Sequence, residues 1–173
     1  GKTVYVDPVG GAVKYAGLPA PDIVLVTHSH SDHMHAATLV GVVRESTVLV
    51  APAGVSGALA GSGVLEIVDE RVMANGDSIQ IGDVKVEAVP MYNITQGRLN
   101  YHQKGVGNGY VLDLDGTRVY IAGDTEDTPE MRALRSVDVA FLPMNLPYTM
   151  TPAMVADAAR AFRPAVLYAY HTG

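Results

Sequence analysis

Histidines are concentrated in one short segment of this chain. Four of its six histidines lie within eight consecutive positions, His28-Ser29-His30-Ser31-Asp32-His33-Met34-His35. A strand-like run (Ile23–Thr27) precedes the segment and a helix-like run (His35–Arg44) follows it. This order predicts a loop at the carboxyl end of a strand, where α/β sheets gather their ligand sites. Imidazoles and carboxylates crowded together in this way are hard to hold unless a cation neutralises them. The segment therefore predicts a metal site, and a polar loop with incidental histidines is the disfavoured alternative.

The composition narrows both the metal ligands and the class of protein. The absence of cysteine excludes a disulfide framework and a thiolate site, so any metal is held by His, Asp, Glu or main-chain oxygen. With 173 residues, 48% apolar and 17% charged, the chain is typical of a single globular domain, residues 1–173. The net charge of −6 disfavours a nucleic-acid partner. No apolar run approaches the roughly 18 residues of a membrane span.

The chain opens at Gly1 without a Met or a signal peptide, so either the Met was removed or upstream sequence is missing. The compartment is therefore undetermined, with the cytoplasm favoured. The expected partner is a small-molecule substrate, and the oligomeric state, including a homo-oligomer, is left open.

Short β-branched runs bounded by Gly, Pro, Asp or Asn predict strands. These are Val4–Val6, Ile23–Thr27, Thr47–Ala51, Val64–Val68, Val84–Val89, Gly109–Leu114, Arg118–Ala122, Val137–Leu142 and Ala165–Tyr170. The predicted helices are His35–Arg44, Ala51–Ala60, Pro129–Leu134 and Ala153–Phe162, the last capped by Thr151 with Pro152 at its first position. Asp115-Gly116 predicts a hairpin turn. The order of elements predicts an α/β layered fold with a mixed sheet.

Three motifs in order give the chain a resemblance to a known family. His28-x-His30-x-Asp32-His33 resembles the metal-binding motif of the metallo-β-lactamase superfamily. Two further strands end in matching residues, Asp124 after Tyr120-Ile121-Ala122-Gly123 and His171 after Tyr168-Ala169-Tyr170. The resemblance covers nearly the whole chain. It implies an αββα sandwich of two mixed β-sheets flanked by helices, here without the N-terminal strand or strands that such proteins usually carry.

One histidine of the family pattern is displaced. In many relatives a ligand directly ends the strand that here continues into Tyr92-Asn93, and His102 is the one histidine left between the cluster and Asp124. We expect the loop from Asn93 to Lys104 to fold back and bring His102 to the metal. The alternative is a surface or substrate-side histidine. The segments around Tyr92, His102, Asp124 and Tyr148 resemble the branch of small hydrolases that includes ascorbate-6-phosphate lactonase and N-acyl-phosphatidylethanolamine phospholipase D.

The resemblance implies a hydrolase with two divalent metal ions, zinc being favoured over manganese or iron. His28, His30 and His102 would hold the first ion, Asp32, His33 and His171 the second, and Asp124 would bridge them. A metal-bound hydroxide would cleave an ester, lactone, phosphodiester or amide, with Asp32 and Asp124 as catalytic residues. The expected substrate-binding residues are Tyr92, Asn93, Tyr101, Asn145 and Tyr148, and the expected supports behind the ligands are Asp7, His35 and Thr125.

Three other functions compete with this interpretation. A non-catalytic or inactive metal-binding domain of the same fold is disfavoured by the full ligand set. A nuclease of the same superfamily is disfavoured by the acidic charge and the short length. A di-iron electron-transfer or oxygen-reducing protein usually has a carboxylate at the position of His30 and an attached flavin domain, neither of which is present here.

Overall fold

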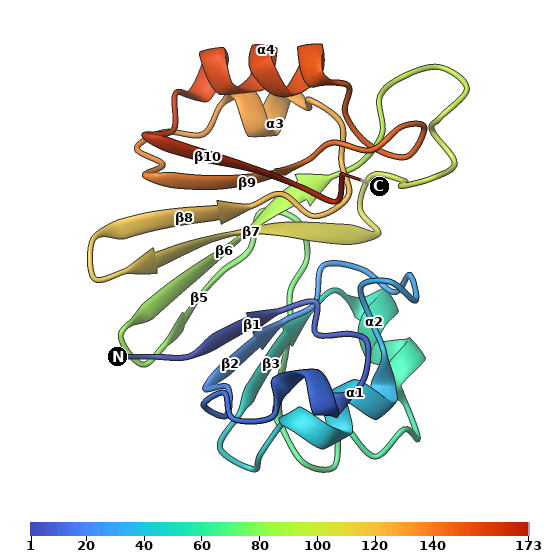
Figure 1. Ribbon diagram of the computed structural model, residues 1–173, viewed down its shortest axis with the longest axis vertical. Coiled ribbons are helices and arrows are strands. Elements are labelled where there is room, and N and C mark those ends of the chain that lie inside the picture. The colour runs from blue at the N-terminus through green and yellow to red at the C-terminus, as the bar shows by residue number, and fades with distance from the viewer. Residues whose placement is uncertain (173) are drawn as a thin grey trace. The chain divides into compact units, whose positions relative to one another are not determined.

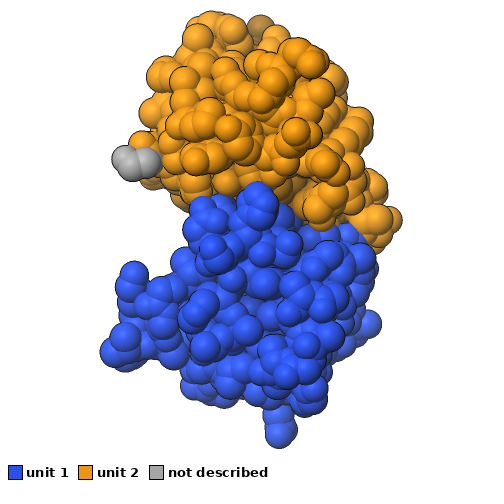
Figure 2. Space-filling view, turned by 90° about the vertical axis from the view of Figure 1, so that its right-hand side faces the viewer, with its two compact units in different colours: residues 1–73 blue, residues 74–173 orange. Residues whose placement is uncertain are grey.

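The computed structural model describes residues 1–172, which form two compact units, residues 1–73 and residues 74–172 (Figure 2). Each unit contains one β-sheet and its own helices (Figure 1). The α/β class predicted from the sequence is therefore confirmed. Within residues 1–172, no helix has the length and apolar character needed to cross a membrane.

The first unit is built on a four-stranded sheet in the order β1-β2-β3-β4, and every strand pair in it is parallel. Parallel strands are covered on their faces and read as continuous apolar runs, which explains why all three residues of β2 are buried. The strands are β1 (Val4–Val6), β2 (Ile23–Leu25), β3 (Val48–Ala51) and β4 (Asp69–Val72). The helices are η1 (Ala12–Tyr15), α1 (Ala36–Val42) and α2 (Ala53–Leu59). Apolar residues of α1, α2, β2 and β3 form one core cluster.

The second unit is built on a six-stranded mixed sheet in the order β10-β9-β8-β7-β6-β5. Strands β5 to β8 form antiparallel pairs, whereas β8, β9 and β10 are parallel. The strands are β5 (Ser78–Ile81), β6 (Val84–Met91), β7 (Gly107–Leu114), β8 (Thr117–Ile121), β9 (Val139–Pro143) and β10 (Val166–Tyr170). The helices α3 (Pro129–Arg132) and α4 (Pro152–Phe162) pack with β7, β8 and β9 in one core cluster.

Local sequence rules account for several of these boundaries. The side chain of Thr151 accepts a hydrogen bond from the Met154 amide, and Pro152 occupies the first turn, so α4 begins where predicted. Asp115 and Gly116 both have positive φ, 54° and 84°, which is the conformation that a two-residue hairpin turn between β7 and β8 requires. The hairpin prediction is therefore confirmed.

Close approach of two strands explains one glycine. A Cβ atom at Gly109 in β7 would lie 2.6 Å from the carbonyl oxygen of Ala122, just after β8. Only glycine lets the two backbones come this near without displacement.

One strand prediction is wrong. The run Val64–Val68 forms turns, and β4 lies directly after it, at Asp69–Val72. Val64 is fully buried in the core cluster of the first unit, so its apolar character reflects packing of a turn. The strands β4 and β5 were not predicted, because they are edge strands with exposed or half-buried residues and lack a clear apolar pattern.

Candidate metal centre

The histidine segment of the first unit forms a tight turn after β2. The amides of His33 and Met34 both donate to the carbonyl oxygen of His30, at 3.0 and 2.8 Å. The turn brings the ring centroids of His28 and His30 to 4.5 Å and those of His28 and His33 to 4.3 Å. His28 and His33 are buried, whereas His30 and Asp32 are exposed. The structure thus gathers the predicted ligands of the first unit.

Asp7 holds this turn from behind. Its Oδ1 accepts a hydrogen bond from the Thr27 amide and its Oδ2 from the Thr27 hydroxyl, each at 2.8 Å. Its Oδ2 also lies 2.7 Å from Nδ1 of His33. Because a carboxylate only accepts, His33 donates through Nδ1. The Thr27 hydroxyl donates its hydrogen to Asp7, so it can only accept a hydrogen bond from Nδ1 of His28, 2.9 Å away. One carboxylate therefore fixes the proton of two imidazoles on Nδ1.

His35 has a different environment. It is exposed, caps the N-terminus of α1, and its Nδ1 lies 2.7 Å from the hydroxyl of Thr38. That hydroxyl also accepts a hydrogen bond from the Gly11 amide. Thr38 therefore links α1 to the segment before η1, and His35 contacts the same hydroxyl.

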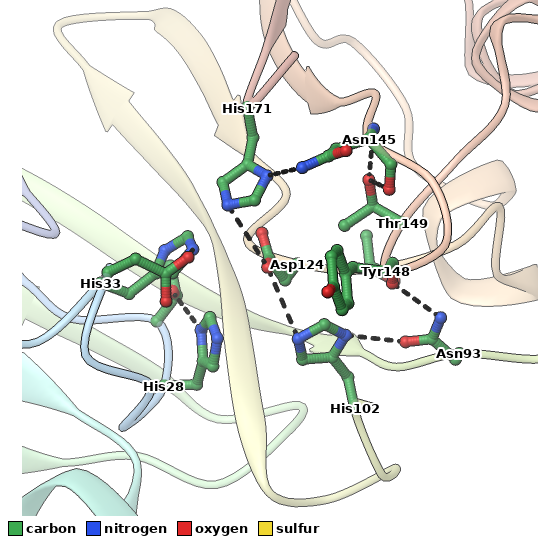
Figure 3. A network of polar contacts seen from close by, with 12 residues as sticks. His28, His33, Asn93, His102, Asp124, Asn145, Tyr148, Thr149 and His171 are labelled. Atoms are coloured by element: carbon green, nitrogen blue, oxygen red, sulfur yellow. Dashed lines mark hydrogen bonds and ion pairs between the residues drawn. The ribbon is translucent and has the colours of Figure 1, made fainter. Parts of the chain in front are cut away.

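The second unit brings together the three remaining predicted ligands. His102 lies in the loop after β6, Asp124 in the loop after β8, and His171 directly after β10. Nε2 of His102 lies 3.5 Å from Oδ2 of Asp124, and Nε2 of His171 lies 3.8 Å from the same oxygen (Figure 3). His102 and Asp124 are buried and His171 is half-buried. The loop after β6 does fold back, as expected, and brings His102 to Asp124.

Asparagine side chains contact the opposite edges of both imidazoles. Oδ1 of Asn93 lies 2.8 Å from Nδ1 of His102. Nδ2 of Asn145 lies 3.4 Å from Nδ1 of His171. A half-turn of the Asn145 amide presents its oxygen to that nitrogen, which is the orientation that ligation through Nε2 of His171 requires.

These spacings fit a bound metal ion. Zinc–nitrogen bonds of about 2.0–2.1 Å in tetrahedral geometry place neighbouring ligand atoms about 3.3 Å apart. The separations of Nε2 from the Asp124 oxygen are close to this value and long for a direct hydrogen bond. Imidazole and carboxylate donors suit zinc, manganese or iron, so the donor chemistry fits as well.

The expected substrate-binding residues fall into two groups. The rings of Tyr101 and Tyr148 pack edge to face with centroids 5.0 Å apart, and both side chains are exposed. Asn93 is 3% exposed, and Tyr92 donates its hydroxyl hydrogen to Oε2 of Glu130 at 2.8 Å. Asn145 closes a turn with Thr149, whose amide donates to the Asn145 carbonyl at 2.7 Å. The two exposed tyrosines can therefore meet a ligand directly, whereas Asn93 is buried and the half-buried Tyr92 is held by its bond to Glu130.

Two glutamates that the sequence analysis missed organise the loop carrying His102. Glu126 is fully buried, and its carboxylate accepts hydrogen bonds from the amides of Ile94 and Thr95 and from the Arg98 guanidinium. The only sequence signal for Glu126 is its position two residues after Asp124. The neighbouring Thr125, also buried, bonds both the amide and the carbonyl of Tyr92 through its hydroxyl.

Glu130 forms a charged cluster with Tyr92 and Lys104. The Lys104 ammonium donates to Oε1 of Glu130 at 2.5 Å and lies 4.7 Å from the centre of the Tyr92 ring. Burial, followed by the hydrogen bond to Glu130, raises the pKa of Tyr92, which keeps its hydroxyl protonated. Burial tends to raise the pKa of Glu130, but the hydrogen bonds from Lys104 and Tyr92 outweigh it and lower that pKa. The bond to Glu130 raises the pKa of Lys104.

Comparisons with known proteins identify what the chain is similar to. The model of a family described as the beta-lactamase superfamily domain matches residues 1–171. A metal-dependent hydrolase of Methanoculleus marisnigri is 34% identical over 167 residues, which cover 92% of this chain and 68% of that protein.

Solved structures agree in fold. A protein of Parabacteroides distasonis, provisionally assigned as a metal-dependent hydrolase, superposes with a TM-score of 0.88 and 45% identity over 98% of this chain and 74% of its own. A metallo hydrolase of Ignicoccus hospitalis has a TM-score of 0.75 at 23% identity over 97% of this chain and 74% of its own, which shows the shared fold. The chain thus spans about two thirds to three quarters of the length of these relatives.

Proposed function

The chain belongs to the metallo-β-lactamase superfamily, and from this premise we propose that it is a hydrolase with a binuclear metal centre. The observation that carries the proposal is the arrangement around Asp124. Two imidazoles from different loops direct Nε2 toward one carboxylate oxygen at ligand-like distances, while asparagines contact their Nδ1 atoms. The names of the relatives, metal-dependent hydrolases, support the same class of reaction.

In this proposal the ligand set is the one predicted from the sequence. His28 and His30 of the first unit and His102 of the second hold one ion. Asp32 and His33 of the first unit and His171 of the second hold the other, and Asp124 bridges the two. Divalent ions at such a site supply Lewis acidity and lower the pKa of a water toward about 7. Zinc is the ion that we favour.

The remaining chemistry belongs to side chains of the chain itself. Asp32 is the exposed carboxylate of the ligand turn, so it can orient the attacking water and accept its proton. Tyr101 and Tyr148 present exposed rings and hydroxyls beside the segment of His102, where they can contact a small-molecule substrate or donate a proton to its leaving group. The substrate class in the proposal is an ester, lactone, phosphodiester or amide.

Replacement of Asp124 tests the proposal. We expect the wild-type protein to bind two zinc equivalents and to hydrolyse either bis-p-nitrophenyl phosphate or a simple lactone. Asp124→Asn should lose at least one equivalent and lower kcat/KM by at least about 100-fold, because the bridging charge is removed. Metal content by elemental analysis and initial rates over both ester classes provide the measurements.

Asp115→Asn is the matched control. It makes the same change at an exposed hairpin turn, where asparagine also tolerates a positive φ. It should keep both zinc equivalents and the wild-type rate. Full zinc occupancy without turnover on either ester class would instead support a non-catalytic metal-binding domain.

A further inference from the structure

Asn93 makes hydrogen bonds through every polar group on its amide side chain and through its backbone amide. Its backbone amide donates to the carbonyl of His102 at 2.9 Å, and its Oδ1 lies 2.8 Å from Nδ1 of the same histidine. The loop from Asn93 to His102 is therefore closed by its two end residues. Glu126 holds the start of this loop by accepting from the amides of Ile94 and Thr95, at 2.7 and 2.6 Å.

The other end of the Asn93 amide determines where the His102 proton lies. Nδ2 of Asn93 is 2.8 Å from the main-chain carbonyl of Tyr148. A carbonyl only accepts, so the amide nitrogen must face Tyr148 and the amide oxygen must face His102. That oxygen also only accepts, so His102 carries its proton on Nδ1. Nε2, the nitrogen facing Asp124, is then the ligating atom.

The side-chain amide of Asn93 also connects the two histidine ligands of the second unit. Residues 145–149 form a turn in which the backbone amide of Asn145 donates to the Thr149 hydroxyl at 2.8 Å and the backbone amide of Thr149 donates to the Asn145 carbonyl at 2.7 Å. Tyr148 lies on this turn, and the Asn145 side chain contacts Nδ1 of His171. A continuous path of contacts thus runs from His102 through Asn93 and the turn to His171 (Figure 3).

We propose that Asn93 is a positioning residue that couples the two histidine ligands of the second unit. The Oδ1 atom sets the tautomer of His102, and the Nδ2 atom sets the turn that carries Asn145 and so orients His171. The inference rests on the proposed metal-binding function of these histidines. It assigns Asn93, which is 3% exposed, a role behind the ligands in place of substrate binding. An aspartate cannot replace Asn93, because the side chain must accept a hydrogen bond from His102 and donate one to the Tyr148 carbonyl.

Asn93→Asp separates the two halves of this role. The variant keeps an acceptor oxygen for His102, but it sets a second oxygen against the Tyr148 carbonyl. We expect zinc to bind about 10- to 100-fold more weakly at the site that includes His171, a residue that Asn93 does not touch. In the metal-free protein, the imidazole resonances of His171 should shift. Chelator-competition titration with zinc and ¹H–¹⁵N NMR of the histidine side chains provide the measurements.

Asn75→Asp is the matched control, because the Asn75 amide also donates to a main-chain carbonyl, that of Gly107, at 2.8 Å. It should lower thermal stability without changing either zinc affinity or the His171 resonances. Wild-type zinc affinity and unshifted His171 resonances in Asn93→Asp would overturn the coupling.

The tautomer of His102 in the wild-type protein tests the inference even if the variant does not fold or the protein binds no zinc. If Asn93→Asp fails to fold, the wild-type spectrum still decides, because a proton on Nε2 of His102 contradicts the inference without any variant. If the wild-type protein binds no zinc, the proposed function fails, whereas the tautomer and the His171 shift still judge the role of Asn93.

Discussion

Asp7 adopts a left-handed backbone conformation, with a φ of 45°, directly after β1. Aspartate tolerates this region better than β-branched residues do, and the conformation still carries a cost of about 1–3 kcal/mol. The carboxylate offsets that cost with its bonds to the amide and hydroxyl of Thr27 and to Nδ1 of His33. The residue therefore combines a strained backbone with the support of two predicted ligands.

Replacement of Asp7 should weaken the metal site without touching a ligand. We expect Asp7→Ala to lower zinc affinity by about 10- to 100-fold, because His28 and His33 lose the groups that fix their protons. Leaving the Thr27 amide without its acceptor should also cost about 1–3 kcal/mol of unfolding free energy. Chelator competition and urea denaturation measure the two effects. Asp22→Ala, which removes a carboxylate bonded to the Thr3 amide, should leave zinc affinity unchanged; equal zinc loss in both variants would contradict the prediction.

Candidate ligands could be predicted from the sequence, because histidine and aspartate are recognisable metal-binding residue types. His28, His30, Asp32 and His33 lie in one motif, and the structure gathers the three histidines into ring contact. Asp124 and His171 each follow a strand, and Nε2 of His171 lies 3.8 Å from Oδ2 of Asp124. The hydrogen bonds of Asn93 to Tyr148 and of Glu126 to Ile94 and Thr95 could not be predicted in the same way, because these partners are more than 30 residues away in the sequence and only the fold brings them together.

At the scale of elements, α3 anchors the exit of β6 through Glu130, Tyr92 and Lys104. The carboxylate has a lowered pKa in the folded protein, so its contribution is present above its ordinary value of 4.5 and is lost as pH falls through the folded-state pKa. Lys104 has a raised pKa, so its contribution is present below 10.5 and is lost as pH rises through its folded-state pKa. The anchor is therefore at full strength between these limits.

Glu130→Gln should make this anchor insensitive to acid. At neutral pH we expect the variant to melt about 1–2 °C below the wild type, since the pair is partly exposed. The difference should shrink as pH falls below 4.5 and through the lowered folded-state pKa of the Glu130 carboxylate, where the wild-type side chain becomes protonated. Thermal melts of both proteins from pH 3 to pH 7 measure the trend. Glu45→Gln, at an exposed position between α1 and β3, should show no such difference; a gap that widens in acid would refute the prediction.

The sequence predicts most elements, and its errors have a physical pattern. Strands buried in the two sheets, such as β2 and β3, have apolar runs and were predicted within a few residues. The edge strands β4 and β5 were missed because main-chain pairing specifies them and their side chains face solvent. The apolar run Val64–Val68 gave the opposite error, because a buried turn has the same composition as a strand.

At the scale of the whole molecule, the predicted ligands are divided between residues 1–73 and residues 74–173. The family and its fold could be predicted because the family's motifs follow one another in the expected order along the whole chain. The comparisons confirm both the family and the fold. The division into two units could not be predicted, since no Gly-, Pro- or Ser-rich linker marks residue 73 in the sequence.

Zinc should stabilise the folded chain. At 100 times the dissociation constant, binding to the folded state contributes about 2.7 kcal/mol, which corresponds to a rise in Tm of about 5–10 °C for a chain of this size. Scanning fluorimetry measures the rise, and hydrogen exchange locates it. We expect slower exchange both in β2 and β3 and in β8 and β9. In Asp124→Asn the effect should be smaller, and unchanged exchange in β8 and β9 would contradict a metal site at Asp124.

Gly109 has a consequence for how this gene can vary. Any side chain at that position meets the carbonyl of Ala122 at 2.6 Å and that of Ile121 at 3.0 Å, two residues or three before Asp124. Because these are main-chain atoms, no rotamer relieves the overlap. A mutation of this codon therefore moves the segment that presents Asp124, even though glycine has no chemistry to lose. If the proposed role of Asp124 holds, selection on its carboxylate therefore extends to a glycine that has no side chain.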